Sequence, residues 1–196
     1  SRAGKNGSRG RRPMTTDLGN LKGSPSSRME IKENQRKSKQ LIFKNMITNI
    51  ALVAHDSRKQ ELLDWVRYNA GSLKHCHLFC TGTTGRLVSE ALTEKLGPEA
   101  PSVVCMLSGP LGGDFEIGGM IAEGKIDMLV FFCDNLIMQG HQNDVMGLTR
   151  LASLYNIPFA TNRSTADFII SSPLYTSEHY KRIIPNCIDS YKNRKL

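Results

Sequence analysis

Hydrophobic residues recur along the chain in short runs that alternate with amphipathic segments. Five runs have the length and composition of buried strands, at 50–54, 77–80, 103–107, 128–132 and 157–160. Between and after them, apolar residues three and four positions apart predict helices at 59–68, 87–92, 117–123, 145–155 and 167–170. Strands that alternate with helices are typical of a parallel sheet covered on both faces. We therefore predict an α/β fold, a single three-layer domain around a central, mainly parallel five-stranded sheet.

The first 46 residues differ sharply from the remaining 150. They contain 12 Lys/Arg and 3 Asp/Glu, whereas the rest contains 14 and 15, so the whole net charge of +8 comes from this segment. A near-neutral body excludes a domain that grips nucleic acid through a basic surface. Because apolar residues are sparse in 1–46, we predict a disordered basic arm there and a folded domain over 47–196. The arm stays open to interpretation as a solvated tail, an RNA-binding arm, a targeting leader or a remnant of cloning.

Two further features of the sequence concern where in the cell the protein is expected. No apolar run reaches the roughly 18 residues that a membrane-spanning helix needs, so we predict no membrane partner. The cysteines are odd in number and mostly lie in apolar stretches, which argues against a disulfide scaffold and favours a reducing, cytoplasmic compartment; they are Cys76, Cys80, Cys105, Cys133 and Cys187.

The segments that follow the five apolar runs are rich in glycines, hydroxyls, histidines and carboxylates. In parallel sheets the carboxyl ends of the strands meet at one edge, and ligands bind there. A purely structural edge needs no such set of side chains, so we predict a binding site at this edge. The residues concerned are His55, Asp56 and Lys59; Thr81, Gly82, Thr83 and Thr84; Ser108, Gly109 and Asp114; Asp134, His141 and Asp144; and Thr161 and Asn162.

Two glycine-containing loops carry most of the chemistry. The loop at 81–85 favours an anion held by backbone N–H groups at a helix start, although Thr83 or Thr84 as a helix cap is the alternative. It has neither the Walker nor the dinucleotide spacing, which indicates a small phosphorylated ligand and argues against ATP or NAD. The loop at 108–114 ends in Asp114, either a helix cap or a catalytic base; its three glycines favour the base, because a cap needs no close backbone approach.

Asp134, His141 and Asp144 form a third group, which we place on one loop. Two carboxylates near one imidazole can orient the ring and select its tautomer. A metal site is the alternative, but neither an H-x-H nor a facial-triad spacing supports it. His75 and His77, near Cys76 and Cys80, superficially resemble a zinc cluster, yet alternation along a strand separates them. We therefore predict no metal site.

Six motifs in the same order resemble methylglyoxal synthases, over about residues 48–196. They are I-A-L-V-A-H-D-x2-K-Q at 50–60, T-G-T-T-G at 81–85, L-S-G-P-x-G-G-D at 107–114, E-G-K-I-D at 123–127, F-F-x-D at 131–134 with the following His141 and Asp144, and N-I-P-x-A-T-N at 156–162 followed by T-A-D-F-I-I. The resemblance implies one α/β domain, a homohexamer, no metal and no organic cofactor. It also implies conversion of dihydroxyacetone phosphate to methylglyoxal and inorganic phosphate, with inorganic phosphate as a candidate allosteric inhibitor.

The same resemblance implies roles for individual residues. Asp114 corresponds to the general base, with His141, Asp134 and Asp144 completing the catalytic set. Arg194, nine residues after Pro185, matches by its spacing an arginine that reaches a neighbouring subunit's phosphate. The substrate-binding residues would be His55, Lys59, Thr81, Gly82, Thr83, Thr84, Ser108, Gly109, His141 and Arg194.

The sequence departs from the family at Asn135 and Gly140, where prolines are usual, which predicts a looser loop before His141. A different function also stays open, because the same fold resembles the regulatory domain of carbamoyl phosphate synthetases, which binds anions without chemistry. Asp114, Asp134, His141 and Asp144 favour the enzyme, since a pure anion site gains nothing from carboxylates beside a phosphate. Nucleic-acid binding would rest on the arm alone.

Overall fold

The computed structural model describes Met29 and residues 49–137 and 140–194. The predicted arm over 1–46 therefore lies outside the described residues, apart from Met29. Five strands form one sheet in the order β3-β2-β1-β4-β5, and every pairing is parallel, which confirms the predicted sheet. The strands are β1 (Asn49–Ala54), β2 (His77–Thr81), β3 (Val103–Met106), β4 (Met128–Phe132) and β5 (Phe159–Ala160).

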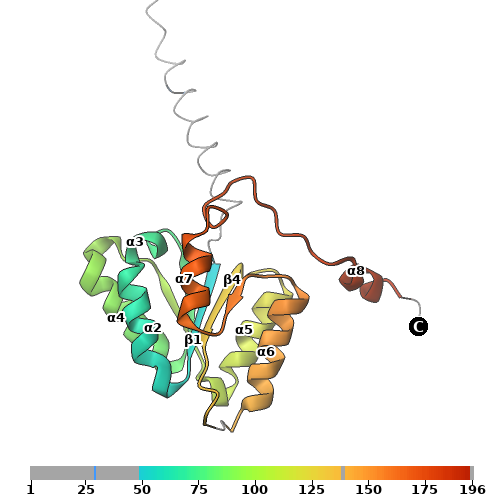
Figure 1. Ribbon diagram of the computed structural model, residues 1–196, viewed down its shortest axis with the longest axis horizontal. Helices are drawn as coiled ribbons and strands as arrows, with labels where there is room; N and C mark the ends of the chain where they lie inside the picture. Colours follow the sequence, from blue (N-terminus) through green and yellow to red (C-terminus); the bar gives the residue numbers. More distant parts are fainter. Residues whose placement is uncertain (1–28, 30–48, 138–139, 195–196) are drawn as a thin grey trace, which may run out of the picture. The chain divides into compact units, whose positions relative to one another are not determined.

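The sheet is covered on both faces, as the alternation of the strand residues requires (Figure 1). On one face Ile50 and Leu52 of β1 pack in a core with residues of α2 (Lys59–Tyr68), α3 (Ala70–Leu73), α4 (Gly82–Leu96) and α7 (Arg163–Ser171). On the other face Ala51 and Val53 pack with α5 (Gly113–Ala122) and α6 (Gln142–Leu154). The three-layer prediction is confirmed. Short helical segments complete the described chain: η1 (Asp56–Arg58), η2 (Gly97–Glu99), η3 (Gly109–Leu111) and α8 (Asn186–Lys192).

The structure differs from the predicted elements at several boundaries and adds helices that were not predicted. β5 has two residues where a strand was predicted over 157–160, because Pro158 has no N–H to donate to a neighbouring strand. α8 has no counterpart among the predicted helices. Within the described part of the chain, no helix is long and apolar enough to cross a membrane.

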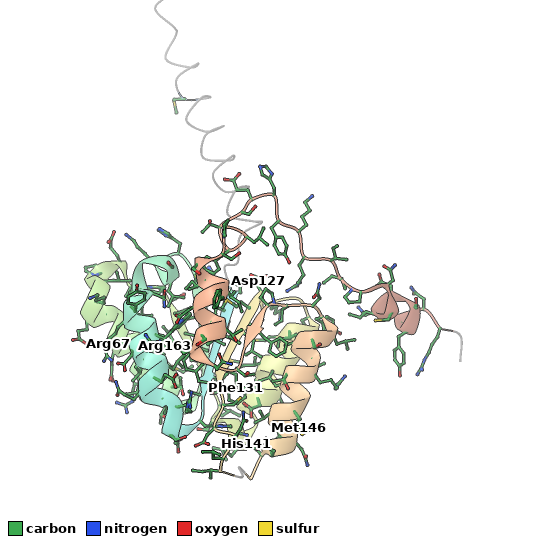
Figure 2. All side chains as sticks on the ribbon, in the orientation of Figure 1. Arg67, Asp127, Phe131, His141, Met146 and Arg163 are labelled. Atoms are coloured by element: carbon green, nitrogen blue, oxygen red, sulfur yellow. The ribbon has the colours of Figure 1, made fainter. Side chains whose placement is uncertain are left out.

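Because all five strands run in the same direction, their amino ends lie along one side of the sheet and their carboxyl ends along the other, and the two sides carry different residues. Asp127 directly precedes β4, and its carboxylate accepts a hydrogen bond from the Asn49 N–H at the start of β1 (3.0 Å). His141 lies at the other end of the sheet, beyond the carboxyl ends of the strands, near Phe131 of β4 (Figure 2). The predicted polar residues thus gather at the carboxyl edge, where the site is found.

Candidate active site

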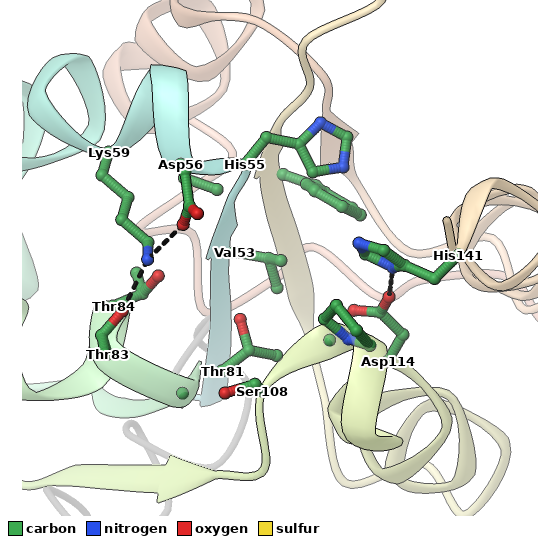
Figure 3. A pocket seen from close by; sticks show the side chains of 15 residues that line it. Val53, His55, Asp56, Lys59, Thr81, Thr83, Thr84, Ser108, Asp114 and His141 are labelled. Carbon is green, nitrogen blue, oxygen red and sulfur yellow. Dashed lines mark hydrogen bonds and ion pairs between the residues drawn. The ribbon is translucent and has the colours of Figure 1, made fainter. Parts of the chain in front are cut away.

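A cavity of about 330 Å³ opens at the carboxyl edge of the sheet. Its size suits a small phosphorylated molecule better than a nucleotide. Most of the predicted site residues line it, which the strand order explains, since β1 lies between β2 and β4 and brings their following loops together. They are His55, Asp56, Lys59, Thr81, Gly82, Thr83, Thr84, Ser108, Gly109, Asp114 and His141 (Figure 3).

Asp114 is the most buried carboxylate that lines this cavity, with 2% of its surface exposed. Its Oδ2 atom accepts a hydrogen bond from Nδ1 of His141 at 2.8 Å, while its buried Oδ1 atom finds no partner among the described residues. A buried oxygen without a donor is costly to stability, so it calls for an explanation in function. Gly112 holds the cap position of α5, so the interpretation of Asp114 as a helix cap is wrong.

Glycines let the Asp114–His141 pair and its loop come together. A Cβ atom at Gly109 would lie 2.9 Å from Cε1 of His141 and 3.1 Å from Oδ2 of Asp114. A Cβ atom at Gly113 would lie 2.0 Å from the carbonyl oxygen of Leu107. The contacts of 2.9 and 2.0 Å are shorter than carbon atoms normally make, so Gly109 and Gly113 are needed for packing around the carboxylate.

His55 is held as a neutral donor. Its Nδ1 atom accepts a hydrogen bond from the backbone N–H of Asp134 at 2.8 Å, so the ring proton of the neutral imidazole belongs on Nε2. That Nε2 atom is buried and makes no hydrogen bond to any described residue. Burial, and then the nearby His141, whose ring centroid is 5.7 Å away, lower the pKa of His55 from its usual value. His55 therefore offers an N–H into the cavity and keeps no charge near neutral pH.

The opposite wall of the cavity carries groups that can hold an anion. Nζ of Lys59 donates to Oγ1 of Thr83 at 2.5 Å and pairs with Asp56 at 2.6 Å, and Figure 3 shows this group across the cavity from Asp114 and His141. α4 already begins at Gly82, whose φ is +44°, so the alternative in which Thr83 or Thr84 caps this helix is wrong. N–H groups in the first turn of a helix have no partner within the helix and favour negative charge.

Comparison with known proteins agrees with this geometry. A family model described as an MGS-like domain matches residues 61–161. The methylglyoxal synthase of Maridesulfovibrio salexigens is 49% identical over 156 residues, covering 76% of this chain and 98% of the relative. The chain belongs to the methylglyoxal synthase family. The methylglyoxal synthase of Proteus mirabilis is 56% identical over 66% of this chain and 81% of the relative. The crystal structure of methylglyoxal synthase from Elizabethkingia anophelis superposes with a TM-score of 0.65 at 44% identity, covering 76% of this chain and 92% of that one.

Three residues that the methylglyoxal synthase resemblance assigned to the site are not among the described residues that line the cavity: Asp134, Asp144 and Arg194. Asp144 lies in the first turn of α6 and not on a loop, and its N–H donates to the carbonyl of His141. Arg194 follows α8, and its guanidinium lies 3.8 Å from the centre of the Tyr191 ring. The side chain that orients the His141 imidazole is Asp114, so the hypothesis that Asp134 and Asp144 hold this ring needs correction.

The backbone N–H of Asp134 holds the His55 ring, and the Asp134 carboxylate is itself held by two hydrogen bonds. The Ser57 hydroxyl donates to Oδ2 at 2.5 Å, and the N–H of Leu136 donates to Oδ1 at 2.9 Å. The Ser57 hydrogen bond is the main reason why the pKa of Asp134 is lowered from its usual value. These bonds fix the turn after β4 and with it the backbone N–H that determines the tautomer of His55.

Sequence reasoning missed several contributors. Ser57 gave no signal, because a serine in a polar loop is common and its partner lies 77 positions away. The remaining lining residues lie in strands that the pattern assigned to the core, or in a loop where no role was assigned to them: Val53, Ala54, Pro110 and Phe131.

The packing of Gly113 yields a stability prediction for this methylglyoxal synthase fold. Gly113→Ala places a methyl group against the Leu107 carbonyl, so we expect the free energy of unfolding to fall by about 1–3 kcal/mol. Gly119→Ala, in the same helix, is the matched control, since its Cβ would meet no described atom within 4 Å and alanine favours the helix. Denaturant unfolding of both variants measures the difference. An equal or higher stability for Gly113→Ala would contradict the predicted contact.

Proposed function

We propose that this chain converts dihydroxyacetone phosphate into methylglyoxal and inorganic phosphate by way of an enediolate. The observation that carries the proposal is the unpaired, buried Oδ1 atom of Asp114 in a cavity whose opposite wall holds Lys59 and Thr83. A base on one side and an anion cradle on the other match a small substrate with a carbonyl at one end and a phosphate at the other.

In the first step Oδ1 of Asp114 removes a proton from the carbon beside the ketone. The electron pair moves onto the ketone oxygen, which becomes an oxyanion and needs a hydrogen-bond donor. His55 supplies it from Nε2, since its Nδ1 atom is occupied by the Asp134 N–H. A neutral imidazole suits this task, because its burial keeps it from taking up a competing proton.

In the second step the enediolate hydroxyl loses its proton, the double bond shifts toward the carbon that carries the phosphate, and the carbon–oxygen bond to the phosphate breaks. This leaves the enol form of methylglyoxal, which takes up a proton at its methylene carbon to give methylglyoxal. The departing phosphate keeps both electrons of that bond, and Lys59 with the first turn of α4 stabilises its charge. His141 is placed to move protons between the substrate oxygens. Its Nδ1 atom is bound to the Asp114 carboxylate, so its Nε2 atom is the one that exchanges protons with the substrate.

An anion-binding regulatory domain fits the structure less well. Such a site would be expected to surround its ligand with donors, whereas this cavity buries a carboxylate that is 2% exposed. The relatives that match most of the chain at about half identity are named as enzymes. Both observations favour the lyase.

Several finer features belong to the same proposal. We assign the activity to residues 47–196, supported by the family match at 61–161, and we propose a reaction that needs neither a metal nor an organic cofactor. The described residues contain no group of three His, Cys, Asp or Glu side chains that could hold a metal ion. The free thiols of Cys80, Cys105, Cys133 and Cys187 support a reducing cytoplasm. We also propose a homohexamer in which Arg194 reaches the site of a neighbouring subunit. Inorganic phosphate is proposed both as the product and as an allosteric inhibitor.

The direct test is to incubate the full chain with dihydroxyacetone phosphate after exhaustive chelation and to measure methylglyoxal and phosphate. We expect equal amounts of both products and no dependence on added metal. Phosphate release without methylglyoxal would indicate a phosphatase. Activity that returned only with added zinc would overturn the cofactor-free mechanism.

The anion wall yields a kinetic prediction. Lys59 holds the phosphate in the ground state and in the transition state alike, so we expect Lys59→Met to raise KM about tenfold or more while kcat changes little. Lys74→Met is the matched control, because Lys74 has a similar exposure and an ion pair with Glu99 but does not line the cavity. Steady-state kinetics on both variants provides the measurement. A fall in kcat with KM unchanged would assign Lys59 to the chemical step.

A further inference from the structure

Two cysteine side chains meet beneath the anion wall of the cavity. Cys80 of β2 and Cys105 of β3 are direct partners in the parallel register of the two strands. Both face α4 at the same place, because a Cβ atom at Gly85 would lie 3.2 Å from Cβ of Cys80, 3.3 Å from Cβ of Cys105 and 2.6 Å from the Cys105 sulfur. Adjacent strands run about 5 Å apart. That spacing lies within the separation of roughly 4.4–6.8 Å over which two Cα atoms can be joined by a disulfide.

The two thiols differ in access to solvent. Cys105 is exposed on the edge strand β3, whereas Cys80 is fully buried. Burial, and then the neighbouring Cys105, raise the pKa of the Cys80 thiol, so Cys80 stays protonated and is a poor first target. An oxidant in solution therefore reaches Cys105 first, and Cys80 is the thiol next to it. An exposed thiol beside a second cysteine is the usual arrangement of a reversible oxidation site.

We propose that Cys80 and Cys105 form a modification site for peroxides, which join the two residues in a disulfide. In the first step the Cys105 thiolate attacks a peroxide oxygen, the O–O bond breaks, and a sulfenic acid forms with release of water or an alcohol. In the second step the Cys80 sulfur attacks the Cys105 sulfur, the S–O bond breaks, and the departing hydroxide takes the Cys80 proton and leaves as water. The two thiols together lose two protons and two electrons, and one peroxide molecule is reduced.

The position of the pair couples it to substrate binding. Cys80 immediately precedes Thr81, and Gly85 lies in the first turn of α4, which carries Thr83 and Thr84 into the cavity. The N–H of Gly82 also donates to the carbonyl of Leu107, two residues after Cys105 (3.1 Å). A bond between the sulfurs changes the surface on which Gly85 packs, where no larger residue fits. We therefore expect oxidation to displace the first turn of α4 and to weaken phosphate binding.

The first test is chemical and does not depend on the proposed reaction. The full chain is treated with hydrogen peroxide, the remaining thiols are blocked, and intact mass and peptide mapping follow. We expect a loss of two hydrogens and a peptide pair that joins Cys80 to Cys105, both reversed by dithiothreitol. Cys105→Ser should form no such bridge, whereas Cys187→Ser, which removes another exposed thiol, should form it normally. The proposed modification site is wrong if peroxide leaves the thiols unchanged, converts Cys105 only to a sulfinic acid, or links other cysteines.

The second test measures the coupling. We expect the bridged protein to bind inorganic phosphate about fivefold more weakly by calorimetry and to show a similar rise in KM for dihydroxyacetone phosphate, with both restored by dithiothreitol. Cys105→Ser should be insensitive to peroxide in both measurements. A complete bridge with unchanged phosphate affinity overturns the coupling. Only the kinetic measurement rests on the proposed function. If the protein has no lyase activity, mass analysis still tests the disulfide and calorimetry still tests its effect on phosphate binding.

Discussion

Asp114→Asn is expected to lower kcat by about 10²-fold or more while the protein still binds inorganic phosphate. The substitution keeps the shape of the side chain but removes the basic Oδ1 atom, the one oxygen of Asp114 that finds no partner in the described structure. The proposed phosphate contacts lie on the opposite wall, at Lys59 and Thr83, so ground-state binding should persist. Steady-state kinetics for turnover and calorimetry for phosphate binding measure the two effects.

A matched control distinguishes a lost base from a general loss of acidic charge. Asp64 lies on the surface of α2, accepts a hydrogen bond from Gln60 and pairs with Arg67, so Asp64→Asn should leave kcat within about twofold. If Asp114→Asn kept half of the native kcat, Asp114 would not be the base. The same kcat loss in both variants would point to a change in folding or assembly.

His141→Gln is expected to lower kcat by about 10²-fold and to change KM much less. Glutamine can still donate a hydrogen bond to Asp114, but it cannot take up and release protons near neutral pH. His77→Gln is the control, since His77 is exposed at the start of β2, its imidazole hydrogen-bonds to Ser102, and it is not among the described residues that line the cavity. A variant that changed KM alone would show that His141 merely binds.

The pH profile of His141→Gln provides an independent measurement. In the native protein His141 is one of the causes that lower the pKa of His55. Without it that pKa rises toward its usual value, so His55 becomes protonated at a higher pH as acid is added. The acidic limb of kcat/KM should therefore move to higher pH. A limb that stayed in place would show that protonation of His55 does not set the acidic limb.

The chain pattern by itself determined the class of fold and the edge that carries the site. Runs such as 50–54 and 128–132 are apolar at every position, which is typical of strands that are buried on both faces. The segments between the runs have helical spacing, and helices that connect successive strands cover both faces of a parallel sheet. Once the sheet is parallel, the residues after each strand must share one edge. That reasoning, with the motif resemblance, was sufficient to bring together Lys59, Thr83, Asp114 and His141.

The tertiary structure alone decided which of these groups touch and in which protonation state. The carboxylate that hydrogen-bonds to the His141 imidazole is that of Asp114, 27 positions earlier, although Asp134 and Asp144 are nearer in sequence. His55 takes its tautomer from a backbone N–H 79 positions away. Spacing along a chain reports only local periodicity, whereas contacts between loops depend on strand order, on the close approach that glycines allow and on side-chain rotamers. Those long-range distances, and the burial that shifts the pKa of His55, exist only after the chain has folded.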